Sequence, residues 1–188
     1  MSEPLQALST LQASDVAARF ALSDDGKALL AAGDSVATAS EKMAAAALWP
    51  EALGLVAYAL PKLAAVSWAR QSAMTLAEHN GPAQQAALTA VEQWMKTRDD
   101  TLRRQCFSAA EAAGLGSAAG CAALAAFWSE GSISPADAPA VPVPPHLCQH
   151  AAACSVQLAG VAQPELAASY YRQFIALATA IAEGKHPV

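Results

Sequence analysis

Alanine dominates this chain and accounts for about 50 of its 188 residues. Alanine has the highest helix propensity of all residues, and no run alternates β-branched or aromatic residues with polar ones as strands do. Prolines and glycines stand where helices would begin and end, for example Pro50 and Pro82 before helix-forming runs and Gly33 and Gly114 after them. The sequence therefore predicts an all-α fold.

The same pattern of prolines and glycines predicts a single helical domain over residues 1–188, a bundle of about seven to nine helices. A chain of 19.2 kDa is large enough to bury one sizeable core. We expect residues 1–13 to be loosely ordered and residues 184–188 to form a frayed tail. The expected helices cover residues 14–22, 24–32, 35–48, 51–59, 61–79, 82–113, 116–129, 147–161 and 164–183.

Two of the expected helices, residues 82–113 and 61–79, contain charged residues that affect how each helix can pack. Residues 82–113 keep one apolar stripe and can form one long helix, or can break near Asp99 and Asp100, either of which can cap a new helix. Arg103 and Arg104 are expected on a solvated helix face. Arg70 lies inside the apolar stripe of residues 61–79, so its head must reach solvent or meet a carboxylate.

Residues 131–145 form an irregular stretch that contains five of the eleven prolines. This density excludes helix and favours an extended, polyproline-type path. Because helices are expected directly before and after it, we interpret the stretch as a proline-rich strap across the surface rather than a linker between domains. We expect the strap to pack on aromatic side chains that include Trp128.

Composition argues against several classes of function. A formal net charge of −5 with eleven scattered Lys and Arg does not suit a nucleic-acid-binding protein. The sequence shows no membrane span and no secretory signal, so we expect a cytoplasmic protein. Its cysteines are therefore expected to be free thiols. No nucleotide-binding or hydrolase motif occurs, which predicts a non-enzymatic protein without a cofactor. The four cysteines are Cys106, Cys121, Cys148 and Cys154.

One cluster of residues offers a different function. If a helix begins near Leu147, His150 and Cys154 lie one turn apart on one face and His146 stands at the entrance. Imidazole and thiolate groups at this spacing can bind zinc or copper. The simpler interpretation is a helix start with surface histidines and packing cysteines. The alternative to a protein without a metal site is a metal- or small-ligand-binding protein, or an enzyme, built on these three residues.

The aromatic residues permit two interpretations. They can close the core under the strap, or they can line a groove that receives a segment of a partner protein. On the second interpretation they form the predicted interaction surface together with two prolines of the strap, and the partner is another protein. This predicted surface consists of Trp49, Tyr58, Trp68, Trp128, Pro142 and Pro144.

Two stretches resemble a family of small, uncharacterised, helical bacterial proteins. The first runs from Trp49-Pro50-Glu51 through Tyr58 to Pro61-Lys62, and the second from Phe127-Trp128 to Pro135 with the Val-Pro-Val-Pro-Pro run after it. The resemblance covers roughly residues 40–180 and implies an association with the gene neighbourhoods of type VI secretion. It implies an accessory or adaptor protein of a secretion apparatus, and it implies no active-site residue.

Overall fold

The computed structural model describes residues 4–76, 80–135 and 137–186, and over this range the chain is all-α, as predicted. It forms ten α-helices and one short 3₁₀-helix, with two isolated β-bridges and no strand in the described part. The 3₁₀-helix covers Pro164–Leu166. The α-helices are α1 (Ala13–Ala17), α2 (Asp24–Leu29), α3 (Val36–Ala45), α4 (Trp49–Ala59), α5 (Lys62–Met74), α6 (Pro82–Thr97), α7 (Asp100–Ala113), α8 (Ala118–Phe127), α9 (Leu147–Val161) and α10 (Ala167–Ala182).

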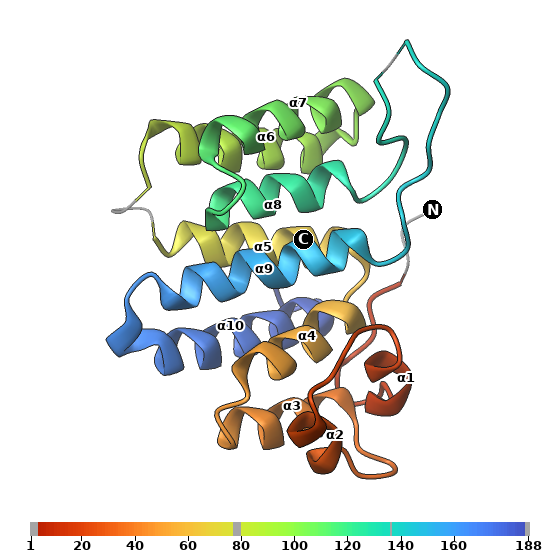
Figure 1. Ribbon diagram of the computed structural model, residues 1–188, viewed down its shortest axis with the longest axis vertical. Helices are drawn as coiled ribbons and strands as arrows, with labels where there is room; N and C mark the ends of the chain where they lie inside the picture. Colours follow the sequence, from red (N-terminus) through yellow and green to blue (C-terminus); the bar gives the residue numbers. More distant parts are fainter. Residues whose placement is uncertain (1–3, 77–79, 136, 187–188) are drawn as a thin grey trace.

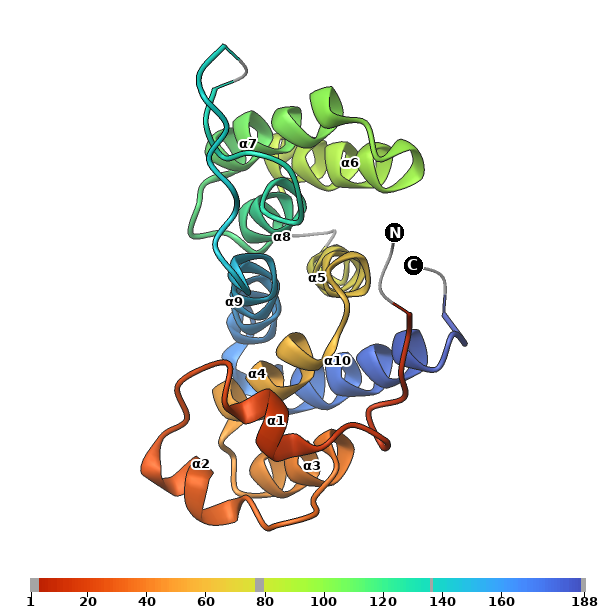
Figure 2. The same ribbon diagram turned by 90° about the vertical axis from the view of Figure 1, so that its right-hand side faces the viewer.

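The helices are stacked in layers along the long axis of the molecule (Figure 1). The pair α6 and α7 lies at one end, followed by α8, then by α5 and α9, then by α4 and α10. The short helices α1 to α3 form the other end (Figure 2). The stack is one continuous core, and the first and last described residues both lie near its middle.

Helix α8 is enclosed by its neighbours. It packs against α5, α6, α7 and α9, and all ten of its residues are buried. Its sequence is alanine, glycine, cysteine, leucine and phenylalanine without a charge, because no face of this helix meets solvent. Among the described residues, no helix combines the length and the hydrophobicity that crossing a membrane requires.

The stretch 82–113 is two helices, which decides the question left open by the sequence. Helix α6 ends at Thr97, and Arg98, which caps it, adopts a left-handed conformation with φ +59°. Asp99 then caps α7, since its side chain accepts a hydrogen bond from the Leu102 amide at 3.0 Å. The structure therefore confirms the alternative in which an aspartate caps a second helix.

Polar groups connect the layers at a few buried points. The Trp68 indole of α5 donates a hydrogen bond to the Phe174 carbonyl of α10 at 2.7 Å. The Ser155 hydroxyl of α9 donates to the Ala118 carbonyl of α8 at 2.7 Å. Arg70 pairs with Glu92 of α6, so of the two alternatives for its guanidinium the structure shows the contact with a carboxylate.

The two ends of the chain are attached to the domain where they are described. Leu8 is buried, and the Ala13 amide donates to the Asp34 carbonyl at 2.9 Å, so this part of the segment expected to be loose packs on the domain. The Lys185 amide donates to the Ala180 carbonyl at 2.9 Å just after α10. The expectations for residues 1–3 and 187–188, and the part of the 61–79 helix after residue 76, lie outside the described residues.

Trp68 gives a test of this packing. Trp68→Ala should lower the free energy of unfolding by about 3–5 kcal/mol, because the indole is fully buried and its donor ties α5 to α10. Trp128→Ala should cost clearly less, since Trp128 is only half-buried at the end of α8. Urea unfolding followed by circular dichroism measures both. Equal losses for the two variants would contradict the inferred arrangement.

Candidate functional site

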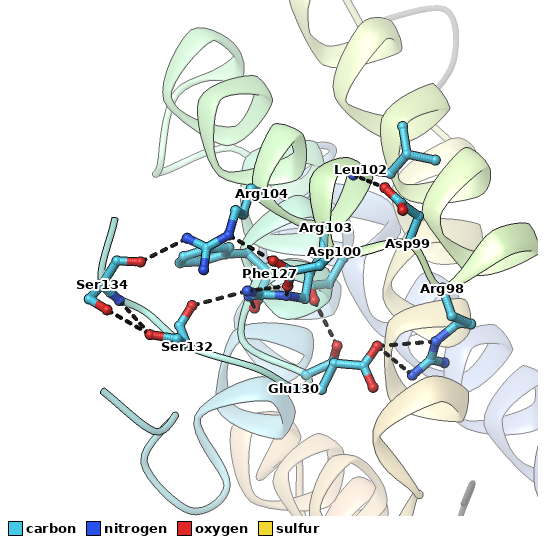
Figure 3. A network of polar contacts seen from close by, with 12 residues as sticks. Arg98, Asp99, Asp100, Leu102, Arg103, Arg104, Phe127, Glu130, Ser132 and Ser134 are labelled. Atoms are coloured by element: carbon cyan, nitrogen blue, oxygen red, sulfur yellow. Dashed lines mark hydrogen bonds and ion pairs between the residues drawn. The ribbon is translucent and has the colours of Figure 1, made fainter. Parts of the chain in front are cut away.

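A fully buried arginine holds the base of the proline-rich segment. Arg103 lies on α7 with no exposed surface, and its Nη1 donates to the Phe127 carbonyl at 2.6 Å. Its Nη2 donates to the Ser132 carbonyl at 3.0 Å, and its Nε donates to Asp100 Oδ1 at 2.8 Å (Figure 3). The guanidinium also lies 4.9 Å from the centre of the Phe127 ring. One side chain therefore joins α7, the end of α8 and the loop that follows.

Arg104 adds a second attachment beside the first. Its Nη1 donates to the Ser134 carbonyl at 2.7 Å and its Nε donates to Asp100 Oδ2 at 2.8 Å (Figure 3). Hydrogen bonds from Arg104 and Arg103 hold the pKa of the Asp100 carboxyl below its ordinary value. The carboxylate thus stays ionised at neutral pH and orients both guanidinium groups toward the loop.

Gly131 is required where the chain passes Arg103. Its φ is +71°, a conformation that favours glycine, and a Cβ atom there would lie 2.8 Å from Arg103 Nη2. The loop backbone can approach the guanidinium this closely only because residue 131 has no side chain.

Beyond Gly131 the segment folds back on itself. Ser132 and Pro142 form an isolated antiparallel bridge, the Ile133 amide donates to the Val141 carbonyl at 3.0 Å, and the Val141 amide donates to Ser132 Oγ at 2.9 Å. The segment extends beyond the α6–α7 end of the stack (Figures 1 and 2). It is thus irregular as predicted, but it is a folded-back loop rather than a strap laid across the domain, because its two arms bond to each other.

The second half of this loop, residues 139–145, is largely exposed, and we call it the proline arm. Val141 is 46% exposed, and Val143 is half-buried. The predicted interaction residues Pro142 and Pro144 both lie on the proline arm and are exposed. The arm is therefore an apolar segment that is fixed at its base and open to solvent. Its exposed prolines are Pro139, Pro142, Pro144 and Pro145.

Arg103→Met tests the anchor. The variant should lose about 3 kcal/mol of stability, because the carbonyls of Phe127 and Ser132 lose their donor while methionine retains most of the side-chain volume. Arg104→Met is the matched control, with an expected loss below about 1 kcal/mol, because Arg104 is partly exposed. Thermal and urea unfolding measure both variants, and an undiminished stability of Arg103→Met would contradict the anchoring role.

The predicted aromatic residues do not gather into one groove. Trp68 is fully buried, so it belongs to the core and not to a surface. Trp49 lies against Tyr171 with 5.5 Å between ring centres, and Arg172 covers it at 5.4 Å. Trp128 is half-buried against the core at the end of α8. Trp49 lies on α4, Trp68 on α5 and Trp128 at the end of α8, so these three rings belong to different layers.

Tyr58 is the one predicted aromatic residue that meets the predicted ligand cluster. Its ring stacks on Phe20 at 4.9 Å and lies 5.7 Å from the His146 ring. Its hydroxyl lies 3.5 Å from His150 Nδ1, and His150 Nε2 lies 3.8 Å from Cys154 Sγ. Tyr58, His150 and Cys154 line a cleft of about 350 Å³ between α4 and α9. His146, His150 and Cys154 thus share one neighbourhood, with Tyr58 between the two histidines.

Among the described residues, no group of three or more His, Cys, Asp and Glu side chains is close enough to hold a metal ion.

The thiols of this protein are held in their neutral form. All four cysteines are free, as predicted. Burial raises the pKa of Cys106 to about 12, of Cys121 to about 11 and of Cys148 to about 12. Burial also raises the pKa of Cys154, so a neutral thiol faces His150.

Thiol reactivity checks this description. At pH 8 the native protein should react slowly with a thiol reagent, because the thiolate is the reactive form and raised pKa values keep it scarce. Cys154 should react first, since it is the most exposed of the four cysteines. The rate should rise as the pH is raised toward the thiol pKa values, and four equivalents should react in denaturant without reductant. A fast phase that persists in Cys154→Ser would contradict this assignment.

Sequence reasoning missed Arg103, which it placed on a solvated face. The signal was present in the spacing, because Arg103, Cys106, Ala110 and Ala113 recur at helical intervals and are the buried residues of α7. An arginine on an apolar stripe needs several acceptors. Besides Asp100, those acceptors are the backbone carbonyls of Phe127 and Ser132, and no residue type in the sequence marks a carbonyl as an acceptor.

The fold and this site define an all-helical protein in which a buried arginine fixes an exposed loop. The model of a family of unknown function, DUF6931, matches residues 39–182, and the chain belongs to this family. The matched region runs from within α3 to the end of α10 and includes Arg103 and the proline arm. No curated protein and no solved structure matches the chain.

Proposed function

We propose that this protein is a non-catalytic protein-interaction module that presents its proline arm to a partner. The observation that carries the proposal is the contrast within one loop: the base is held by a fully buried arginine, while Val141 and four prolines stay exposed. An apolar segment of this kind gains stability when another surface covers it.

Backbone entropy supports this use of the arm. Proline fixes φ, and residues that precede proline are pushed toward extended conformations, so the run from Val141 to Pro145 has few alternative shapes. The Arg103 attachment restricts the base further. A segment that is already ordered loses little entropy on binding, and proline-rich segments dock in aromatic-lined grooves for this reason.

The proposal reverses the roles expected from the sequence. The predicted aromatic residues of this chain do not form one groove, so in this proposal the aromatic groove belongs to the partner, and this chain supplies the prolines. The sequence resemblance adds the finer proposal that the partner is part of a bacterial secretion apparatus and that the protein is its adaptor. That finer proposal rests on the resemblance alone.

Val141→Asp is the test of this function. A charge at the centre of the exposed arm should abolish capture of a specific partner without lowering the melting temperature, because Val141 is 46% exposed. Val161→Asp is the matched control, since Val161 is 50% exposed at the end of α9, away from the loop. Cross-linking and mass spectrometry identify proteins held by the native chain, and titration of the purified pair then measures affinity. Equal affinity of the native chain and Val141→Asp would exclude the proline arm as the contact.

A further inference from the structure

A pocket of about 480 Å³ opens where α5 and α9 begin. Its wall is formed by the α4–α5 corner with Tyr58 and Lys62, by the start of α9 with His146 and Gln149, and by Arg19 after α1. None of the residues that line it is an aspartate or a glutamate. Tyr58 lines both this pocket and the His150 cleft, and Pro145, the last residue of the proline arm, also lines the pocket.

Two helix N-termini meet at this pocket. Helix α5 has 13 residues and begins after Pro61, and α9 has 15 residues and begins after His146. Neither helix has a side-chain cap, so the amide groups of both first turns retain donors that no cap satisfies. The two starts are adjacent, since Cys148 Sγ lies 3.8 Å from the Lys62 carbonyl. The partial positive charges of two helix dipoles therefore add in one place.

Two of the three uncompensated cations in the described part of the chain line the same pocket. Within the described residues, Arg19, Lys62 and Arg172 are the arginines and lysines that make no ion pair with a carboxylate. Arg172 covers Trp49. The other two line the pocket, where Arg19 uses one donor on the Tyr58 carbonyl at 3.1 Å and has further donors to offer.

A buried amide in the wall lacks a partner. Gln149 is 6% exposed, and its Oε1 has no hydrogen-bond partner. A buried polar atom without a partner costs free energy, and this oxygen has almost no contact with solvent, so a bound molecule recovers the cost by supplying a donor once the amide turns toward the pocket. A half turn about the last side-chain bond exchanges the two ends of the amide, so Gln149 can meet either kind of group.

We propose that this pocket binds a small organic phosphate. The phosphate group lies at the starts of α5 and α9 between Arg19 and Lys62, where two cations and two helix dipoles match a dianion. The organic part carries a hydroxyl or amino group that bonds to Gln149. The volume of the pocket is within the range of small-ligand sites in proteins. The proposal does not depend on a protein partner for the proline arm.

Titration with inorganic phosphate tests the anion site. At constant ionic strength in chloride, amide NMR signals of residues 62–64 and 147–149 should shift and saturate. Lys62→Met should weaken binding about tenfold or more, because a charge-assisted contact is lost. Lys62→Arg should keep it within severalfold. The control is Lys27→Met, which removes the same charge from an exposed residue outside the pocket and should leave the affinity unchanged.

Glycerol phosphate tests the part played by Gln149. It should bind more tightly than inorganic phosphate, because its hydroxyl groups can satisfy the amide, and Gln149→Leu should remove the difference between the two probes. Absence of saturable shifts, shifts confined to other residues, equal weakening by Lys27→Met, or tighter binding of acetate than of phosphate would each overturn the proposal. Circular dichroism of each variant confirms that the comparison is made on folded protein.

Discussion

Close approach between alanine-rich helices is the constraint on which the rest of this structure depends. Helix α8 can be surrounded on all sides only because most of its side chains are methyl groups or hydrogen. At Gly160 an added Cβ would lie 2.0 Å from the Tyr171 ring of α10, so even one methyl group is excluded there. Each methyl group buries little area, which leaves a modest hydrophobic contribution per residue. Directional bonds from Trp68, Ser155 and Arg103 therefore set how the layers align.

Most helices and their approximate bounds were predictable, because these features depend on local chemistry, whereas the break between α6 and α7 was one of two alternatives that the sequence left open. Asp99 caps α7 through its own side chain, and Arg70 meets a carboxylate as its place on an apolar stripe requires. Features that depend on distant backbone groups were not predictable. The acceptors of Arg103 are carbonyls 24 and 29 residues away, and a carbonyl has the same sequence signature at every position. The dispersal of Trp49 and Trp68 over different layers follows from helix directions, which the sequence does not encode locally.

The two proposed binding features are adjacent on one connection between α8 and α9. The connection leaves the Arg103 attachment at Ser132, and the last residue of the proline arm, Pro145, already lines the pocket at the start of α9. His146 then adopts φ +62° to begin the helix. Rigid elements hold the connection at both ends, namely α7 and α8 at one and α5 and α9 at the other. The loop is thus constrained by two separate parts of the core, although its exposed residues contribute little to that core.

The folded-back loop has a consequence for how the chain can vary. Its attachment uses the backbone carbonyls of residues 132 and 134 and the bridge to Pro142, whereas Asp137 and Ala138 at the turn are exposed. Lengthening a loop whose ends are already fixed adds only a small closure entropy. The turn is therefore a natural insertion point, where foreign peptide sequence can be displayed on a rigid helical support without disturbing the packing of the alanine-rich layers.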